Sequence, residues 1–177
     1  MCTIWDYQSG QLIRELIGHR AGITALTYHP DAVLLATASL DRTVKLWQVS
    51  NGQLVGTLRV HTKPVKAIAF SPNGTTLATG GDDNQIVLWQ VKNQQPICKI
   101  PGHSWTVSAL AFMADSNICI SGSWDNTISL WDVVTGQKKL SLKGHTDKIL
   151  AVAALASREV ISIGSDHMLC HWMLNPS

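Results

Sequence analysis

Histidine, serine and aspartate, the residue types of a hydrolytic triad, lie within a short stretch of this sequence at His103, Ser123 and Asp125. In such a triad the serine attacks, the histidine takes its proton and the aspartate orients the histidine, and one activated set beside an oxyanion hole is enough. Here related sets return along the chain in partly altered form. No G-x-S-x-G elbow, phosphate-binding glycine loop or H-E-x-x-H helix accompanies them. We therefore expect these repeated sets to have a structural role, and we expect no catalytic residues.

The sets recur because the whole chain has a period of about 42 residues. The same spacing relates five tryptophans, four histidines and four aspartates, namely Trp5, Trp47, Trp89, Trp131 and Trp172; His19, His61, His103 and His145; and Asp41, Asp83, Asp125 and Asp166. A period of roughly 40–45 residues is typical of propeller blades. We predict a single repeat domain, 1–177, with repeats at 11–49, 53–91, 95–133 and 137–174. Residues 1–10 would be the end of a truncated preceding repeat.

Each repeat contains four short apolar runs separated by turn residues. In the second repeat they are 54–58, 65–70, 76–80 and 85–91, and the turn Ser71-Pro72-Asn73-Gly74 joins the second run to the third. Four such strands form an antiparallel meander that is marginally stable alone, so copies must stack on one another about an axis. The predicted fold is all-β, a β-propeller segment of about four blades.

The repeats resemble the WD40 family. The matching residues are the pairs Gly18-His19, Gly102-His103 and Gly144-His145, the pairs Trp5-Asp6 and Trp131-Asp132, and the turns at 39–43 and 123–127. The resemblance implies that each sequence repeat supplies the outer strand of one blade and the three inner strands of the next. It places the outer strands at 12–16, 54–58, 97–100 and 139–142.

The resemblance also implies a buried hydrogen-bond network of histidine, hydroxyl, aspartate and tryptophan in each blade. It maps onto His19, Ser39, Asp41 and Trp47, and onto His103, Ser123, Asp125 and Trp131. The other two sets are His61, Asp83 and Trp89, and His145, Asp166 and Trp172. Gly81 and Gly164 stand at their hydroxyl position, so we expect these two networks to be incomplete.

Two tryptophans, Trp105 and Trp124, fall outside the period. The WD40 resemblance places both in loops on one face of one blade, so we expect them to lie near each other. Exposed tryptophans are frequent interface hot spots. The alternative is that Trp124 covers its own turn.

Four cations occupy loops of the same kind: Arg20, Arg42, Lys63 and Lys148. A ring of cations would favour an acidic or phosphorylated peptide. The alternative is an ordinary solvated surface, since Asp31, Asp82 and Asp147 dilute the positive field.

Charge and cysteine content limit the classes of partner, cofactor and location that we expect. A net charge of +2 indicates no strong attraction to nucleic acid or to an anionic membrane. The four cysteines have no paired spacing, and residues 1–10 lack a secretory signal, so we expect reduced thiols and a cytoplasmic location. His167 and His171 lack enough partners for a metal site. No cofactor is expected.

About four blades make an open arc when family members usually close with about seven. Three alternatives remain: a piece of a longer propeller, pairing with a second chain through the open edges, or closure of a four-bladed ring with 12–16 completing the last blade. The function that we expect is a non-catalytic scaffold for a protein or peptide partner. The alternatives are a regulatory or sensory part of a larger signalling protein and, less favoured, a nucleic-acid-associated propeller.

Overall fold

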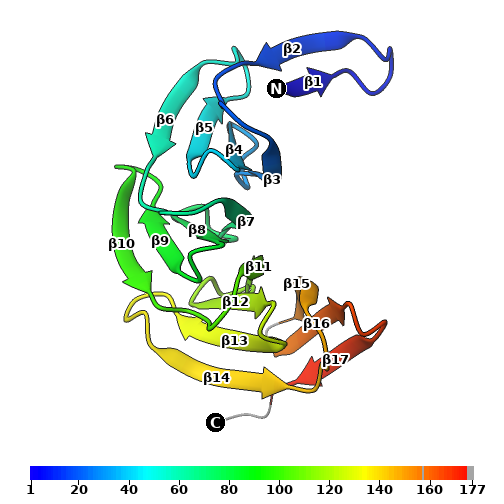
Figure 1. The fold of residues 1–177 in the computed structure, drawn as a ribbon. Helices are drawn as coiled ribbons and strands as arrows, with labels where there is room; N and C mark the ends of the chain where they lie inside the picture. Colours follow the sequence, from blue (N-terminus) through cyan, green and yellow to red (C-terminus); the bar gives the residue numbers. More distant parts are fainter. Residues whose placement is uncertain (157, 175–177) are drawn as a thin grey trace.

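The structure, a computed structural model, describes residues 1–156 and 158–174. Residues 175–177, which the sequence analysis includes in the repeat domain, lie outside this described part. The described residues form strands β1 to β17 and no helix, and neighbouring strands in each sheet are antiparallel (Figure 1). No helix with the length and apolar character of a membrane span occurs among them.

Three sheets are complete four-stranded meanders. The first contains β3 (Ile23–Tyr28), β4 (Leu34–Ser39), β5 (Val44–Gln48) and β6 (Leu54–Leu58). The second contains β7 (Val65–Phe70), β8 (Thr76–Gly81), β9 (Ile86–Gln90) and β10 (Gln95–Ile100). The third contains β11 (Val107–Phe112), β12 (Ile118–Ser123), β13 (Thr127–Asp132) and β14 (Lys138–Lys143). We call them the first, second and third blades.

Two further sheets lie at the ends of the arc that the blades form (Figure 1). One, the fourth blade, has three strands, β15 (Ile149–Ala156), β16 (Glu159–Gly164) and β17 (Leu169–Met173). The other pairs β1 (Cys2–Trp5) with β2 (Leu12–Leu16), in a register that sets Cys2 opposite Leu16. Because β2 bonds to β1 and not to β17, the four-bladed closed ring is wrong. The predicted open propeller segment is confirmed.

The outer strands come from the following repeat, as the WD40 resemblance implies. β6 pairs with β5 so that Val44 lies opposite Leu58 and Trp47 opposite Leu54. β2 and β6 have the predicted bounds, whereas β10 and β14 begin earlier than predicted. β10 begins at Gln95, which pairs with Gln90, and β14 begins at Lys138, which pairs with Trp131, and β14 also ends one residue later than predicted, at Lys143.

The core lies between the blades and not inside any one of them. Between the first and second blades, Ala36, Val44 and Leu46 of one sheet pack with Phe70 and Leu77 of the next. Similar clusters join the second blade to the third and the third to the fourth. Burying one such large side chain contributes about 1.5–3 kcal/mol. Each meander is therefore stabilised by its neighbours.

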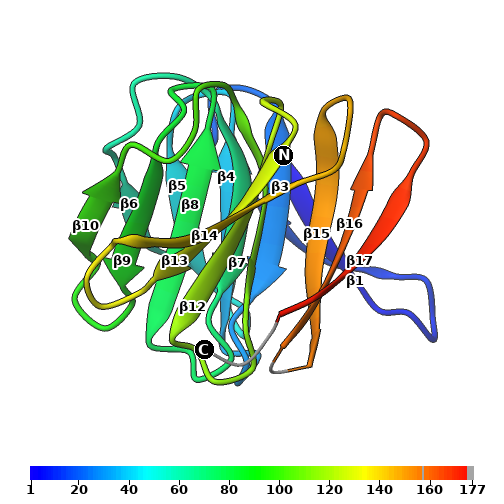
Figure 2. The same ribbon diagram turned by 90° about the horizontal axis from the view of Figure 1, so that it is seen from below.

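The stacking also sorts the loops onto two faces. At the start of each inner strand the chain lies beside the turn between the second and third strands, as Ile23 lies opposite Ser39. In Figure 2 the strands of successive sheets run in similar directions, so loops of one kind gather on one face. We call the face with the inner-strand entry loops and these turns the entry face. It carries every loop in which the sequence analysis placed a binding residue.

Candidate functional site: the entry face

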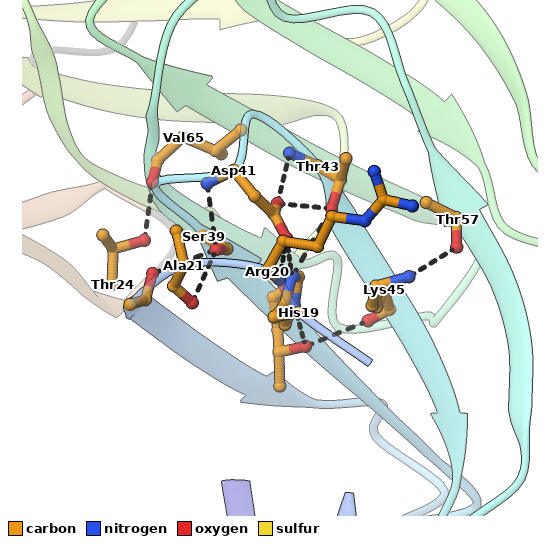
Figure 3. A network of polar contacts seen from close by, with 12 residues as sticks. His19, Arg20, Ala21, Thr24, Ser39, Asp41, Thr43, Lys45, Thr57 and Val65 are labelled. Atoms are coloured by element: carbon orange, nitrogen blue, oxygen red, sulfur yellow. Dashed lines mark hydrogen bonds and ion pairs between the residues drawn. The ribbon is translucent and has the colours of Figure 1, made fainter. Parts of the chain in front are cut away.

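A hydrogen-bonded chain of four side chains supports the entry face in the first blade. The indole Nε1 of Trp47 donates to Thr37 Oγ1 over 2.8 Å, and His19 Nε2 lies 2.8 Å from the same hydroxyl. His19 Nδ1 lies 2.8 Å from Asp41 Oδ2 (Figure 3). Asp41 then accepts the backbone amide of Arg20 at 2.9 Å. The entry loop is thus tied to the turn between β4 and β5.

The hydroxyl in this chain is not the one that the sequence analysis assigned. Thr37 and Ser121 accept the indole protons, whereas Ser39 and Ser123 lie two residues further, at the strand ends. Ser39 Oγ instead accepts the Asp41 amide at 3.1 Å and donates to Gly22 O at 3.0 Å. Residues two apart in a strand share a face, which is why the sequence alone did not separate them.

The second correction follows from the first. Gly81 and Gly164 do not interrupt their networks, because Thr79 and Ser162 supply the hydroxyls. Trp89 Nε1 donates to Thr79 Oγ1 at 2.9 Å, and Trp172 Nε1 donates to Ser162 Oγ at 2.8 Å. All four networks are complete. The histidine–aspartate contacts are His61 with Asp83, His103 with Asp125, and His145 with Asp166.

The aspartates are held ionised by these contacts. Burial by itself would raise the pKa of Asp41, but hydrogen bonds from the Thr43 hydroxyl, the Arg20 amide and His19 outweigh it and hold this pKa well below the usual range. The same balance, with His103 and Thr127 as the leading donors, lowers the pKa of Asp125. A carboxylate that accepts several hydrogen bonds favours its charged form. The sets therefore serve as turn anchors.

Trp105 and Trp124 line one pocket on the entry face, between the third and fourth blades. The pocket has a volume of about 430 Å³, and its other lining residues are Ser104, Asp125, Asn126, Asp147 and Lys148. The Trp105 side chain is 59% exposed, whereas Trp124 is half-buried. Lys148 Nζ lies 4.7 Å from the centroid of a Trp124 ring, in the geometry of a cation–π contact. We call this the tryptophan pocket.

The loops around this pocket are tied together by hydrogen bonds to their backbone carbonyl oxygens. Ser123 Oγ donates to Trp105 O at 3.3 Å, and the Trp124 amide donates to Thr106 O at 3.0 Å. Asn126 Nδ2 reaches across to Thr146 O at 3.2 Å in the loop of the fourth blade. The pocket is therefore largely pre-formed, which lowers the entropic cost of binding.

The four predicted cations do not form one ring. Lys148 lies in the tryptophan pocket, whereas Arg20 lines a different and more polar pocket on the first blade. Arg42 Nη1 donates to Thr62 O at 3.5 Å, a bridge to the second blade like that of Asn126 to Thr146. Lys63 is exposed in the entry loop of the second blade.

Two residues of the polar pocket, Lys45 and Arg59, were not predicted from the sequence. The pocket has a volume of about 160 Å³, and its lining also includes Gly18, Asp41 and Thr43. Lys45 departs from the repeat, because Val87 and Ser129 occupy the same place two residues before the repeating tryptophan. This departure from the repeat is the feature of the sequence that could have identified Lys45 as a candidate binding residue. No three histidine, cysteine, aspartate or glutamate side chains gather as a metal site in the described part of the chain.

Comparison with known proteins agrees with this geometry. A family model described as the DDB1- and CUL4-associated factor 12 β-propeller matches residues 52–163, and the WD40 (G-beta) repeat model matches residues 10–48. The chain therefore belongs to the WD40-repeat β-propeller family. WD40 propellers are in general non-catalytic scaffolds that bind protein partners.

Solved structures show the same arrangement of blades. One, described as the structure of U3-55K, is 25% identical with a TM-score of 0.83, and covers 90% of this chain and 54% of that one. Another, described as the crystal structure of RRP9 WD40 repeats, is 26% identical with a TM-score of 0.83, and covers 90% of this chain and 53% of that one. The chain thus spans about half the length of these structures. A search of curated proteins found no match.

Proposed function

We propose that this chain is a non-catalytic docking platform for a protein partner, and that the tryptophan pocket is the centre of the contact. The observation that carries the proposal is the exposed Trp105 indole beside Trp124 and Lys148 in a pre-formed pocket. Neither indole belongs to the repeating scaffold. A large rigid aromatic side chain buries much area at little entropic cost, and tryptophans are enriched among interface hot spots.

The chemistry of the pocket favours a partner side chain with an apolar body and an acidic tip. The indole faces supply the apolar contact. The Lys148 ammonium, stacked over Trp124, can reach a carboxylate without leaving the ring. Two carboxylates also line the pocket, and neither forms an ion pair with Lys148. Asp125 accepts the Ser104 amide at 3.0 Å and contacts His103. Asp147 accepts the Lys148 amide at 2.7 Å.

The partner is proposed to be a protein, in keeping with a family model named for a protein that is described as associated with DDB1 and CUL4. We propose a cytoplasmic location on the basis of four free cysteines. The observation that the chain covers 53–54% of related solved chains favours a second candidate, in which it is one part of a larger regulatory propeller protein.

The test is affinity capture with the full chain as bait, followed by mass spectrometry. Partners captured by the native protein should be lost from the Trp105→Ala, Trp124→Ala double variant. The matched control is Trp5→Ala, which removes an indole that is also largely exposed but lies in β1. Partners that the double variant retains would contradict the proposal, and a lowered melting temperature would assign the indoles a structural role.

A further inference from the structure

The geometry points to a second binding site, which takes a tetrahedral oxyanion of the phosphate class. It is the polar pocket on the first blade, lined by Gly18, Arg20, Asp41, Thr43, Lys45 and Arg59. The volume of about 160 Å³ is several times the roughly 30 Å³ that one water occupies in the liquid, so an oxyanion fits.

Lys45 is the least expected residue of this oxyanion pocket. It lies in β5 two residues before Trp47, and only 6% of its surface is exposed. Its ammonium donates to Thr57 Oγ1 at 3.1 Å and forms no ion pair within the described part of the chain. A buried charge without a counter-charge is unfavourable unless something pairs with it.

The groups around Lys45 make its positive charge still less favourable without a bound anion. Burial lowers its pKa, and although Asp41 acts in the opposite sense, the positive charges of Arg59 and Arg20 lower it further. Both arginines are exposed at the pocket rim. Figure 3 shows Arg20 and Lys45 extending from different parts of the first blade, with the Lys45 ammonium bonded to Thr57.

Asp41 supplies only one negative charge against the three cations, and it forms no ion pair with Lys45. Its carboxylate already accepts the Arg20 and Thr43 amides and the Thr43 hydroxyl, the last at 2.6 Å, and contacts His19. Three cations facing this one carboxylate leave the pocket with an excess of two positive charges. A phosphate monoester dianion has the matching charge, and guanidinium groups bind phosphate oxygens in a bidentate manner.

The scaffold does not require these cations. At the place of Arg20 the other blades have Thr62, Ser104 and Thr146, whose amides make the same bond to their aspartates. The backbone amide therefore performs the structural task, and the guanidinium is additional. At the place of Lys45 they have Val87, Ser129 and Cys170, so the three cations coincide in the first blade alone.

The experiment is a titration of the ¹⁵N-labelled chain with inorganic phosphate at pH 7, with sodium chloride adjusted to hold ionic strength constant. We expect saturable shifts of the Gly18, Arg20 and Thr43 amide signals. A parallel titration with N-acetyl-phosphoserine amide separates two sources of the same group. Tighter binding than phosphate indicates a phosphorylated side chain, and equal or weaker binding indicates the free anion.

Three variants test the assignment. Arg59→Gln and Lys45→Met should each weaken phosphate binding at least about tenfold, as expected for one lost charge-assisted hydrogen bond. Lys143→Gln is the control, because Lys143 is the exposed cation at the place of Arg59 in the third blade. Arg59 is exposed, so this variant remains informative if Lys45→Met does not fold.

Non-saturable shifts in the native protein, or equal losses in Arg59→Gln and Lys143→Gln, would overturn the assignment. The experiment uses no protein partner and leaves Trp105 and Trp124 in place. Its outcome is therefore independent of the docking proposal for the tryptophan pocket.

Discussion

Trp89 Nε1 donates a hydrogen bond to Thr79 Oγ1, 2.9 Å away and ten residues earlier in the chain. The same hydroxyl lies 2.7 Å from His61 Nε2. One buried oxygen thus connects the tryptophan of β9 to the histidine of the entry loop, and through Asp83 to the turn after β8. The contact shows how the scaffold holds the entry-face loops in place.

Loss of this hydroxyl should destabilise the second blade. In Thr79→Val the shape is nearly retained, but the indole and His61 lose a buried partner, which costs about 1–3 kcal/mol. The measurement is the urea unfolding midpoint at pH 7. Thr62→Val, at an exposed site, is the control and should unfold at the native midpoint. Equal midpoints for Thr79→Val and the native protein would contradict this account of the network.

A serine at position 81 should destabilise the protein, although Ser39 and Ser123 occupy the equivalent places. A Cβ atom at Gly81 would lie 2.1 Å from the backbone oxygen of Pro64 and 2.9 Å from Val65 Cα. Backbone atoms cannot yield as a flexible side chain can, so Gly81→Ser should cost about 1–3 kcal/mol or more. Thermal melting checks this prediction. A raised melting temperature would contradict this prediction, because it would indicate that the second blade lacks a hydroxyl that the added serine supplies.

Acid should unfold the protein through the anchoring aspartates. The folded-state pKa values of Asp41, Asp83 and Asp125 are lowered, because hydrogen bonds and histidine contacts outweigh the effect of burial, which raises them. Depressed pKa values stabilise the fold above the unfolded value of about 3.9, and that contribution is lost as the pH falls toward the folded values. The free energy of unfolding should therefore decrease below about pH 4.

Urea titrations between pH 2.5 and 7 measure this dependence. The slope below pH 4 should be smaller in Asp125→Asn than in the native protein, since one linked carboxylate is missing. Asp115→Asn, in an exposed turn, is the control and should keep the native slope. An unchanged slope in Asp125→Asn would show that this carboxylate does not contribute.

Cysteine reactivity should follow burial. Cys119 is fully buried in the core between the second and third blades, and burial strongly raises the pKa of its thiol. Since the thiolate is the reactive form, iodoacetamide at pH 8 should label the half-buried Cys2 and Cys170 well before Cys119. Mass spectrometry of peptides from the native protein measures the order. Early labelling of Cys119 would indicate that this core opens readily.

The fold could be predicted from the sequence largely because it repeats. The 42-residue spacing of tryptophan, histidine and aspartate, together with short apolar runs, was sufficient to predict meanders stacked in an open propeller. The proximity of Trp105 to Trp124 was expected from the WD40 resemblance, and the structure gives its local cause, because the pairing of Val107 with Ser123 sets the start of β11 beside the end of β12. The prediction of meanders depends on local pairing, which strand alternation and turn positions encode.

Tertiary packing decided the rest. The choice of Thr37 over Ser39 depends on how the Trp47 ring lies across β4, and alternation alone places both hydroxyls on one face. The separation of Arg20 from Lys148 depends on the angle through which one blade follows the next. The oxyanion pocket joins Lys45 to Arg59 and Arg20 from different segments of the first blade. Spacing along the chain encodes which strands pair, but side chains from different segments meet only after the blades have stacked.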